Sequence, residues 1–327
     1  MFSPRQRITE TIAGAALIIA VFSIVSRVLG VVRDRMLATT FGAGQELDLY
    51  YAAFRLPDLI FNLLVLGALS AGFIPIFSKL MAQQEKEKAW RLTNNIINLL
   101  MVGLVGLCLI GIVTAPWLIS YLAPGFSADV MPTLLSLTRI MFLSPLLLGL
   151  SSIVGGVLQA KRRFFIYSLS PIFYNVGIII GAVYLTSIMG LEGLAWGVVL
   201  GSVLHLLIQL PTLWKAGFRY QPLFQWKDSS VRSVFKMMSA RTASLGVTQV
   251  NLIIITIIAS TLPSGALSVF NLANNLQFLP ISLFGISFAL AVFPLLSAAP
   301  TTEKLTALFS RTFRHILFFI IPATVII

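Results

Sequence analysis

Nine apolar stretches, each long enough to cross a lipid bilayer, alternate with short connectors along this 327-residue chain. A membrane-spanning helix needs about 20 mostly apolar residues. On that criterion we expect helices near residues 11–30, 54–78, 94–114, 133–158, 165–186, 191–213, 234–260, 266–297 and 312–327. The sequence therefore predicts an all-α polytopic membrane protein with about nine transmembrane helices.

The composition excludes an ordinary soluble domain. Hydrophobic residues make up 57% of the chain and charged residues 10%, whereas roughly a quarter of the residues in soluble proteins are charged. The mean hydropathy is +0.94. The sequence contains no Walker loop, no metal-ligand spacing and no catalytic module, and Cys108 is its single cysteine. We therefore expect no catalytic residue, no cofactor and no metal site.

The positive charges mark one side of the membrane. Lys and Arg total 23 against 11 acidic residues, a net charge of +12, which in a soluble protein would suggest nucleic acid as a partner. Here the basic residues collect in alternate connectors, such as 161–163, and cytoplasmic loops hold such an excess. We therefore expect no nucleic acid, a cytoplasmic N-terminus, a cytoplasmic amphipathic linker at 215–233, and outside loops at 114–132, 187–190 and 261–265.

Some charged residues are not needed for topology, which makes them candidate functional residues. They are Arg27, Arg55, Arg139 and Arg241 within spans and Arg33, Asp34, Arg35, Asp48 and Asp58 at or near span ends. Arg139 and Arg241 could instead extend to the membrane interfaces and be structural. Arg55 and Asp58 lie three residues apart on one helix and could neutralise each other. No acidic residue lies within one turn of Arg27, so its partner is another helix or a ligand. Because guanidinium groups donate in pairs to phosphate oxygens, arginines near one helix end suit a phosphate or diphosphate.

An internal repeat organises the chain. A motif series at 38–44, 52–57 and 73–78 is echoed at 259–265, 273–278 and 293–297. Six predicted spans separate the copies, an even number, so both have the same orientation, as parallel transporter repeats require. We therefore expect a six-helix lobe at 1–214 and the first three helices of a second lobe at 234–327. Because the chain ends within the third of these helices, we expect the sequence to be incomplete.

A second, ordered motif series covers residues 26–78. It consists of Ser26-Arg27-Val28-Leu29-Gly30-Val31-Val32-Arg33-Asp34, Phe41-Gly42-Ala43-Gly44, Asp48, Phe54-Arg55-Leu56-Pro57-Asp58-Leu59 and Gly67-Ala68-Leu69-Ser70-Ala71-Gly72-Phe73-Ile74-Pro75. This series resembles the MurJ (MviN) family of lipid II flippases, within the multidrug/oligosaccharidyl-lipid/polysaccharide exporter superfamily. The resemblance implies a multi-pass protein of the bacterial inner membrane. It would turn an undecaprenyl-diphosphate-linked peptidoglycan precursor from the cytoplasmic to the periplasmic leaflet by alternating access.

The resemblance also implies an architecture and a site. Family members have two six-helix lobes around a cationic cavity, usually followed by two helices that form a groove for the lipid tail, which this chain would lack. Ser26, Arg27 and Arg33 match cavity positions, and Arg55 and Asn275 are further candidates for substrate binding. The candidate gate or structural polar residues are Asp34, Asp48, Arg35 and Asp58.

The chain departs from the family pattern at three positions. Phe61 stands where many members have an arginine, Leu66 where they have an acid, and Asn275 where a cation is common. Cavity charge therefore rests mostly on the first helix, and the substrate alternatives stay open.

Besides lipid II, the substrate could be another polyprenyl-diphosphate glycan, or the chain could be a related multidrug exporter. A non-transporting truncated membrane protein is a further alternative. The expected partners are the lipid-linked glycan and membrane lipids, with cell-wall synthesis proteins as further candidates. The energy source is a coupling cation or the membrane potential.

Overall fold

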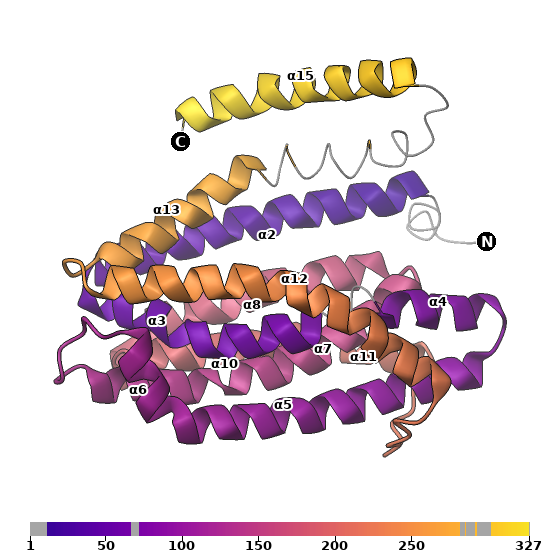
Figure 1. Cartoon of the computed structure of the whole chain (residues 1–327), viewed down its shortest axis with the longest axis horizontal. Coiled ribbons are helices and arrows are strands. Elements are labelled where there is room, and N and C mark those ends of the chain that lie inside the picture. Colours follow the sequence, from indigo (N-terminus) through magenta and orange to yellow (C-terminus); the bar gives the residue numbers. More distant parts are fainter. Residues whose placement is uncertain (1–11, 67–71, 282–284, 286–291, 293–301, 327) are drawn as a thin grey trace. The chain divides into compact units, whose positions relative to one another are not determined.

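The computed structural model of the chain describes residues 12–66, 72–281, 285, 292 and 302–326. Within these ranges every regular element is a helix. The chain divides into two compact units, Met1–Ser268 and Val269–Ile327. The long helices of the first unit share one direction and form a bundle (Figure 1).

Most of the helices belong to the first unit. In chain order they are α2 (Ile12–Phe41), α3 (Gln45–Ile60), the π-helical η1 (Phe61–Leu66), α4 (Ile74–Ala82), α5 (Lys86–Leu122), α6 (Met131–Met141), α7 (Leu143–Ala160), α8 (Phe164–Ile180), the π-helical η3 (Gly181–Leu185), α9 (Thr186–Met189), α10 (Glu192–Leu207), α11 (Leu210–Lys215) and α12 (Ser229–Ser260). Helix α13 (Ala266–Pro280) begins in this unit and continues in the second, which also contains α15 (Thr302–Ile326).

The structure confirms a polytopic membrane protein. Among the described residues, 6 helical segments are long and apolar enough to cross a membrane. They are Lys86–Leu122, Met131–Ala160, Phe164–Met189, Glu192–Lys215, Thr242–Ser260 and Leu305–Val325. The predicted total of nine is not confirmed.

The first two helices differ from their predicted bounds. The prediction that the first helix ends near residue 30 is wrong, because residues 31–41 contain neither Gly nor Pro and α2 continues to Phe41. It ends where Gly42 adopts a φ of 68° and donates its N–H to the Ala38 carbonyl at 3.0 Å, a common glycine termination. The second helix begins at Gln45 rather than 54, with two acidic residues in its first turn, where negative charge is favoured.

Part of the predicted repeat, the segment at 293–297, lies outside the described residues. Residues 67–71 of the motif series at 26–78, the N-terminal residues 1–11 and the side chain of Arg241 also lie outside the described residues. The division into lobes at 1–214, 215–233 and 234–327 therefore stays a prediction.

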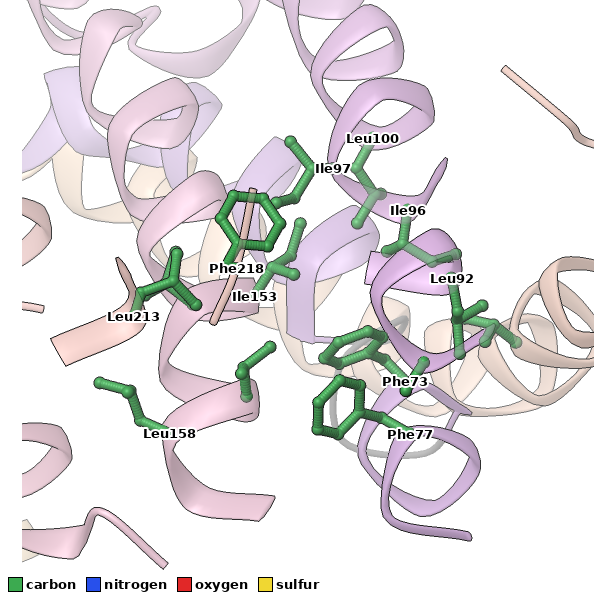
Figure 2. Packing of buried hydrophobic residues seen from close by; sticks show 14 of the residues in the cluster. Phe73, Phe77, Leu92, Ile96, Ile97, Leu100, Ile153, Leu158, Leu213 and Phe218 are labelled. Atoms are coloured by element: carbon green, nitrogen blue, oxygen red, sulfur yellow. The ribbon is translucent and has the colours of Figure 1, made fainter. Parts of the chain in front are cut away.

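A buried apolar cluster joins α4, α5 and α7 to the segment that follows α10 (Figure 2). Phe73 and Phe77 pack with Leu92 and Ile96 of α5, and Phe218 closes the cluster. The aromatic rings of Phe77, Trp90 and Phe218 form a chain with centroids 5.6 and 5.8 Å apart. This packing fixes one end of the bundle.

Helix α8 and the η3 segment that follows it approach α10 through glycines. A Cβ atom added at Gly177 would lie 2.3 Å from the Cα of Gly201, and one added at Gly181 would lie 2.4 Å from the Cα of Gly197. Real Cβ atoms do not come that close to backbone. Small residues that let backbones touch are typical of helix pairs in lipid, where dispersion rather than water exclusion drives association.

Asparagines of α5 bind the backbone of the segment after α11. Asn98 donates to the carbonyls of Gln221 and Leu223 at 2.9 and 3.0 Å, and Asn95 accepts from the Gln225 N–H at 2.6 Å. Asn94 both accepts from the Gln221 N–H and donates to the Arg219 carbonyl. The predicted linker is thus bound along α5 by side-chain amides that satisfy its backbone groups.

We predict that Gly177→Ala destabilises the protein by about 1–3 kcal/mol, because the added methyl group overpacks the contact with Gly201. The midpoint of thermal unfolding in detergent measures this loss. Gly103→Ala on α5 is the matched control, since a Cβ there would meet nothing within 4 Å and alanine favours helix. Equal midpoints for the two variants would contradict the prediction.

We predict that Asn98→Ala releases the segment at 219–225 from α5, because two backbone carbonyls lose their donor, at a cost of about 1–3 kcal/mol. Limited trypsin digestion should then cleave faster after Arg219 and Lys227. Thr114→Ala is the control, since its hydroxyl donates to the Ile110 carbonyl of its own helix. Unchanged cleavage in Asn98→Ala would show that the amide contacts do not hold the segment.

Candidate functional site

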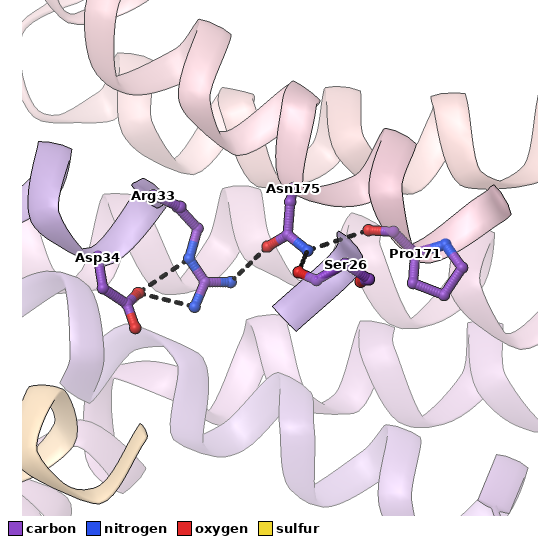
Figure 3. Close-up of polar contacts among 5 residues, drawn as sticks. All are labelled: Ser26, Arg33, Asp34, Pro171 and Asn175. Carbon is purple, nitrogen blue, oxygen red and sulfur yellow. Dashed lines mark hydrogen bonds and ion pairs between the residues drawn. The ribbon is translucent and has the colours of Figure 1, made fainter. Parts of the chain in front are cut away.

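The guanidinium group of Arg33 joins α2 to α8 inside the first unit (Figure 3). It donates from Nε and Nη2 to Asp34 Oδ1 at 3.0 and 2.7 Å and from Nη1 to Asn175 Oδ1 at 3.0 Å. The side chains of Arg33 and Asp34 are 21% and 13% exposed. These bonds use three of the five N–H donors of an arginine, so the group can also donate to a ligand.

Asn175 completes this arrangement from α8. Its Nδ2 donates to the carbonyl of Pro171 at 3.1 Å and to that of Ser26 at 3.5 Å. Ser26 and Arg33 are seven residues apart, close to two helical turns, so both lie on the face of α2 that meets α8. The structure therefore brings together Ser26, Arg33 and Asp34 from the sequence prediction.

Arg27 points in another direction from α2. At 100° per residue it lies about 120° around the helix from Arg33, and its side chain is partly buried. Arg27 and Arg33, which we expected near one phosphate or diphosphate, therefore lie on different faces of α2. Arg35, two residues beyond Arg33, is exposed.

Arg55 connects α3 to α12. Its side chain is buried, and Nε donates to Thr256 Oγ1 at 2.8 Å. Asp58, one turn further along the chain, is partly buried and interacts electrostatically with Arg55. The expected neutralisation of Arg55 by Asp58 stays a prediction, and the hydrogen bond of Arg55 reaches a helix that lies 201 residues away in the sequence.

Asp48 binds the start of α13. Its Oδ2 accepts from the Gly265 N–H at 2.7 Å, while Oδ1 accepts from the N–H and Oγ of Ser268 at 2.7 and 2.5 Å. The carboxylate is 2% exposed. Gly265 has a φ of 94°, and a Cβ there would lie 2.2 Å from the Ala43 carbonyl oxygen. A negative group at a helix N-terminus is favoured, so this contact links the ends of α3 and α13.

Asn275 lies further along α13, in the second unit, and its side chain is exposed. The described residues thus supply several polar contacts between helices rather than one converged cluster. The contacts at Arg33, Arg55 and Asp48 each join elements from distant parts of the sequence.

Sequence reasoning missed three partner residues: Asn175, Thr256 and Ser268. Asn175 is a polar residue within a predicted span, and such a residue is itself a sign of function. A search limited to charged residues does not find it. A separate polar group surrounds His205, a lone histidine in an apolar helix, whose Nδ1 lies 2.7 Å from Ser151 Oγ. Gln209 Nε2 donates to the same hydroxyl at 2.7 Å, so the histidine is hydrogen-bonded inside the helix bundle.

Comparison with known proteins identifies the family of the chain. The family model described as lipid II flippase MurJ matches residues 37–327. The lipid II flippase MurJ of Burkholderia cenocepacia is 34% identical over 293 residues, covering 87% of this chain and 57% of that protein. The probable lipid II flippase MurJ of Vibrio cholerae is 31% identical over 303 residues, covering 89% and 57%.

Solved structures show the same fold. A lipid II flippase MurJ in an inward closed conformation superimposes with a TM-score of 0.76 at 22% identity, covering 93% of this chain and 63% of that one. An inward-facing multidrug resistance MATE transporter of the MOP superfamily gives a TM-score of 0.68 at 16% identity, covering 91% and 69%.

The chain spans about half the length of the curated relatives it matches, 57% for the protein from Burkholderia cenocepacia. Because the family model begins its match at residue 37, the residues from Ser26 to Arg35 lie before the matched region. The match nevertheless covers most of the chain. This chain belongs to the MurJ family of lipid II flippases.

Proposed function

We propose that this protein translocates an undecaprenyl-diphosphate-linked peptidoglycan precursor, lipid II, from the cytoplasmic to the periplasmic leaflet by alternating access. The observation that carries the proposal is the Arg33 guanidinium group, held inside a helical bundle whose relatives are named lipid II flippases. The protein is a multi-pass membrane protein. We infer that it lies in the bacterial inner membrane with a cytoplasmic N-terminus.

The physical problem is the polar headgroup. An unpaired charge or an unsatisfied hydroxyl group in hydrocarbon costs several kcal/mol, so a diphosphate and its sugars need a polar path. Arg27 and Arg33 would bind the diphosphate through guanidinium N–H groups. The lipid tail would stay in the surrounding hydrocarbon while the headgroup crosses.

We assign the remaining candidate residues either to substrate binding or to the gate. Ser26, Arg55 and Asn275 would contribute to substrate binding, and Asp34 would hold Arg33 in place. Asp48 would close the outer gate by binding the start of α13. Arg35 and Asp58 would act as further polar residues of the gate or the helix interior.

The repeat supports a movement of one lobe against the other. The contacts of α12 with α3 lie between the predicted first and second copies, and such contacts must change if the lobes rock. Membrane lipids would be constant partners, and cell-wall synthesis proteins are proposed partners without a specific contact here.

The fold similarity to a multidrug resistance MATE transporter supports a second candidate function. Export of a drug would need a cavity for an apolar or cationic molecule rather than a diphosphate. A flippase for a different polyprenyl-diphosphate glycan would use the same arginines as lipid II translocation. Substrate assays separate these candidates.

We predict that Arg27→Ala and Arg33→Ala abolish rescue of a bacterium depleted of its own lipid II flippase, when the protein is expressed from its complete gene. Loss of one charge-assisted hydrogen bond costs about 1.5–3 kcal/mol, or roughly a 10- to 100-fold loss of affinity. The measurements are growth and the amount of lipid II exposed at the outer leaflet.

Arg139→Ala is the control for these variants. Arg139 is exposed on α6, and its position near a predicted span end is typical of a residue at the membrane interface. No rescue by the correctly inserted parent would favour another glycan, a drug or a non-transporting role. Equal rescue by parent and both variants would remove these arginines from the mechanism.

We predict that Asp48→Asn weakens the contact between α3 and α13, because the amide keeps one acceptor oxygen but loses the charge. Hydrogen exchange of the Gly265 and Ser268 amides should accelerate by roughly 10- to 100-fold, corresponding to about 1.5–3 kcal/mol. Asp129→Asn in the exposed loop before α6 is the control. Unchanged exchange in Asp48→Asn would show that the carboxylate does not close this gate.

A further inference from the structure

A cavity of about 320 Å³ lies between the turn that joins α7 to α8 and the end of α11. Arg162, Arg163 and Phe165 line it from the turn and the first residues of α8, and Thr212 and Lys215 line it from α11. Its volume is within the range of small-ligand sites. None of these residues is a candidate for substrate binding or for the gate, so the cavity is separate from the site of the proposed function.

The cavity lies at the level where three candidate membrane spans end. The span Met131–Ala160 ends just before the turn, Phe164–Met189 begins just after it, and Glu192–Lys215 ends at the wall of the cavity. Lipid headgroups occupy this level of a bilayer, directly outside the hydrocarbon core. Both leaflets carry lipid phosphates, whichever face of the membrane this end of the bundle occupies.

The charges around the cavity favour an anion. Arg162, Arg163 and Lys215 are exposed, and within the described part of the chain no carboxylate forms an ion pair with any of them. Among the described residues, no acidic side chain lines the cavity. Helix α8 begins here without a side chain that caps its first N–H groups, and the positive end of its dipole adds to the same field.

Lys161 ties the turn before α8 to the end of α11. Its Nζ donates to the Ala216 carbonyl at 2.8 Å and lies 5.1 Å from the ring centroid of Trp90. The ammonium group of Lys161 is therefore bound within the protein, whereas Arg162 and Arg163 can reach a ligand. The same contact holds the two walls of the cavity at a fixed separation.

Arg162 has a backbone conformation that favours glycine. Its φ is 57°, and the N–H groups of Arg162 and Arg163 donate to the Gln159 and Leu158 carbonyls at 3.0 and 2.7 Å. This is a common pattern of helix termination, in which glycine is usual at the position of Arg162. A side chain at that φ is unfavourable for the turn. Topology requires positive charge only somewhere in the loop, so an arginine at this position indicates a further role.

Exposed aromatic side chains favour a lipid over a soluble anion. Phe165, which lines the cavity, is 47% exposed, and Trp214, next to Lys215 on α11, is 61% exposed. Aromatic residues collect at the headgroup level of membranes. A soluble phosphate would gain nothing from these rings, whereas the glycerol group and the upper acyl chains of a lipid would cover them.

We propose that this cavity binds the phosphate group of an anionic membrane lipid. Arg162, Arg163 and Lys215 donate to the phosphate oxygens, for which guanidinium groups have a matching geometry. Phe165 and Trp214 contact the upper part of the acyl chains. Basic pockets between membrane helices bind anionic headgroups in this way. The bound lipid connects the turn before α8 with the end of α11 and anchors this end of the bundle at the membrane surface.

Photocross-linking locates the lipid directly. The full-length protein is placed in nanodiscs of phosphatidylcholine that contain a small fraction of phosphatidylglycerol with a photoreactive acyl chain, and the cross-linked peptides are mapped by mass spectrometry. We expect the cross-links to accumulate at residues 164–166 and 212–216. Replacing part of the phosphatidylcholine with unlabelled phosphatidylglycerol should reduce them, whereas added inorganic phosphate should not.

Arg162→Gly is the informative variant, because it removes a positive charge and places a glycine where φ is positive. We expect the yield of cross-links at these residues to fall roughly tenfold, since a charge-assisted hydrogen bond is lost. The midpoint of thermal unfolding should not fall, because glycine adopts this φ without strain, so misfolding cannot explain the loss. Lys227→Gln is the control of equal charge change. Lys227 is exposed and does not line the cavity, and its variant should keep the yield of the parent.

Three outcomes would overturn the proposal. The first is an equal yield in Arg162→Gly and Lys227→Gln, and the second is a spread of cross-links over the spans without accumulation at these residues. The third is displacement of the probe by inorganic phosphate, which would identify a site for a soluble anion. Rescue of a flippase-depleted strain is measured separately, so failure of the transport proposal leaves this result intact.

Discussion

A polar group inside a bilayer must find its partner within the protein, because lipid offers none. That constraint explains how the helices of the first unit meet. Arg33 of α2 binds Asn175 of α8, and Arg55 of α3 binds Thr256 of α12. Each contact ties together helices whose apolar surfaces alone would pack in many ways, since lipid tails and leucine side chains are equally apolar.

Glycines complement these polar contacts by bringing backbones together. The glycines that α8 and η3 pair with those of α10 create a contact that has no room for a single methyl group. Asn175 lies on α8, so the binding partner of Arg33 is carried on a well-fixed support. Catalytic and binding groups depend on this kind of support, because a site on a rigid element is held more accurately than one on a loop.

The polar contacts also fall where elements from distant parts of the sequence meet. Asp48 binds the start of α13, and α12 is bound at both Arg55 and Leu63. A few polar contacts can break and form again at a modest cost in free energy. The apolar cluster around Phe77 and Phe218 would lose its close packing if it opened. The bundle therefore combines an apolar, closely packed end with separate polar contacts between helices.

The sequence by itself determined the fold class and most of the spans, because a run of apolar residues has one stable outcome in a bilayer, a hydrogen-bonded helix. It also pointed to Arg33, Asp48 and Arg55 as charged residues that the topology does not need, and the family resemblance added Ser26. The extent of α2 was misjudged, because hydropathy falls at Arg33 while helix propensity does not.

Only the tertiary structure decided which partners those residues have. Asn175, Thr256 and Ser268 are uncharged and lie 142, 201 and 220 residues from the side chains they bind. A hydrogen bond depends on the position of two atoms in space, and a local pattern of hydropathy or charge does not contain that position. The sequence therefore shows which groups must be satisfied, and the packing of the helices decides how.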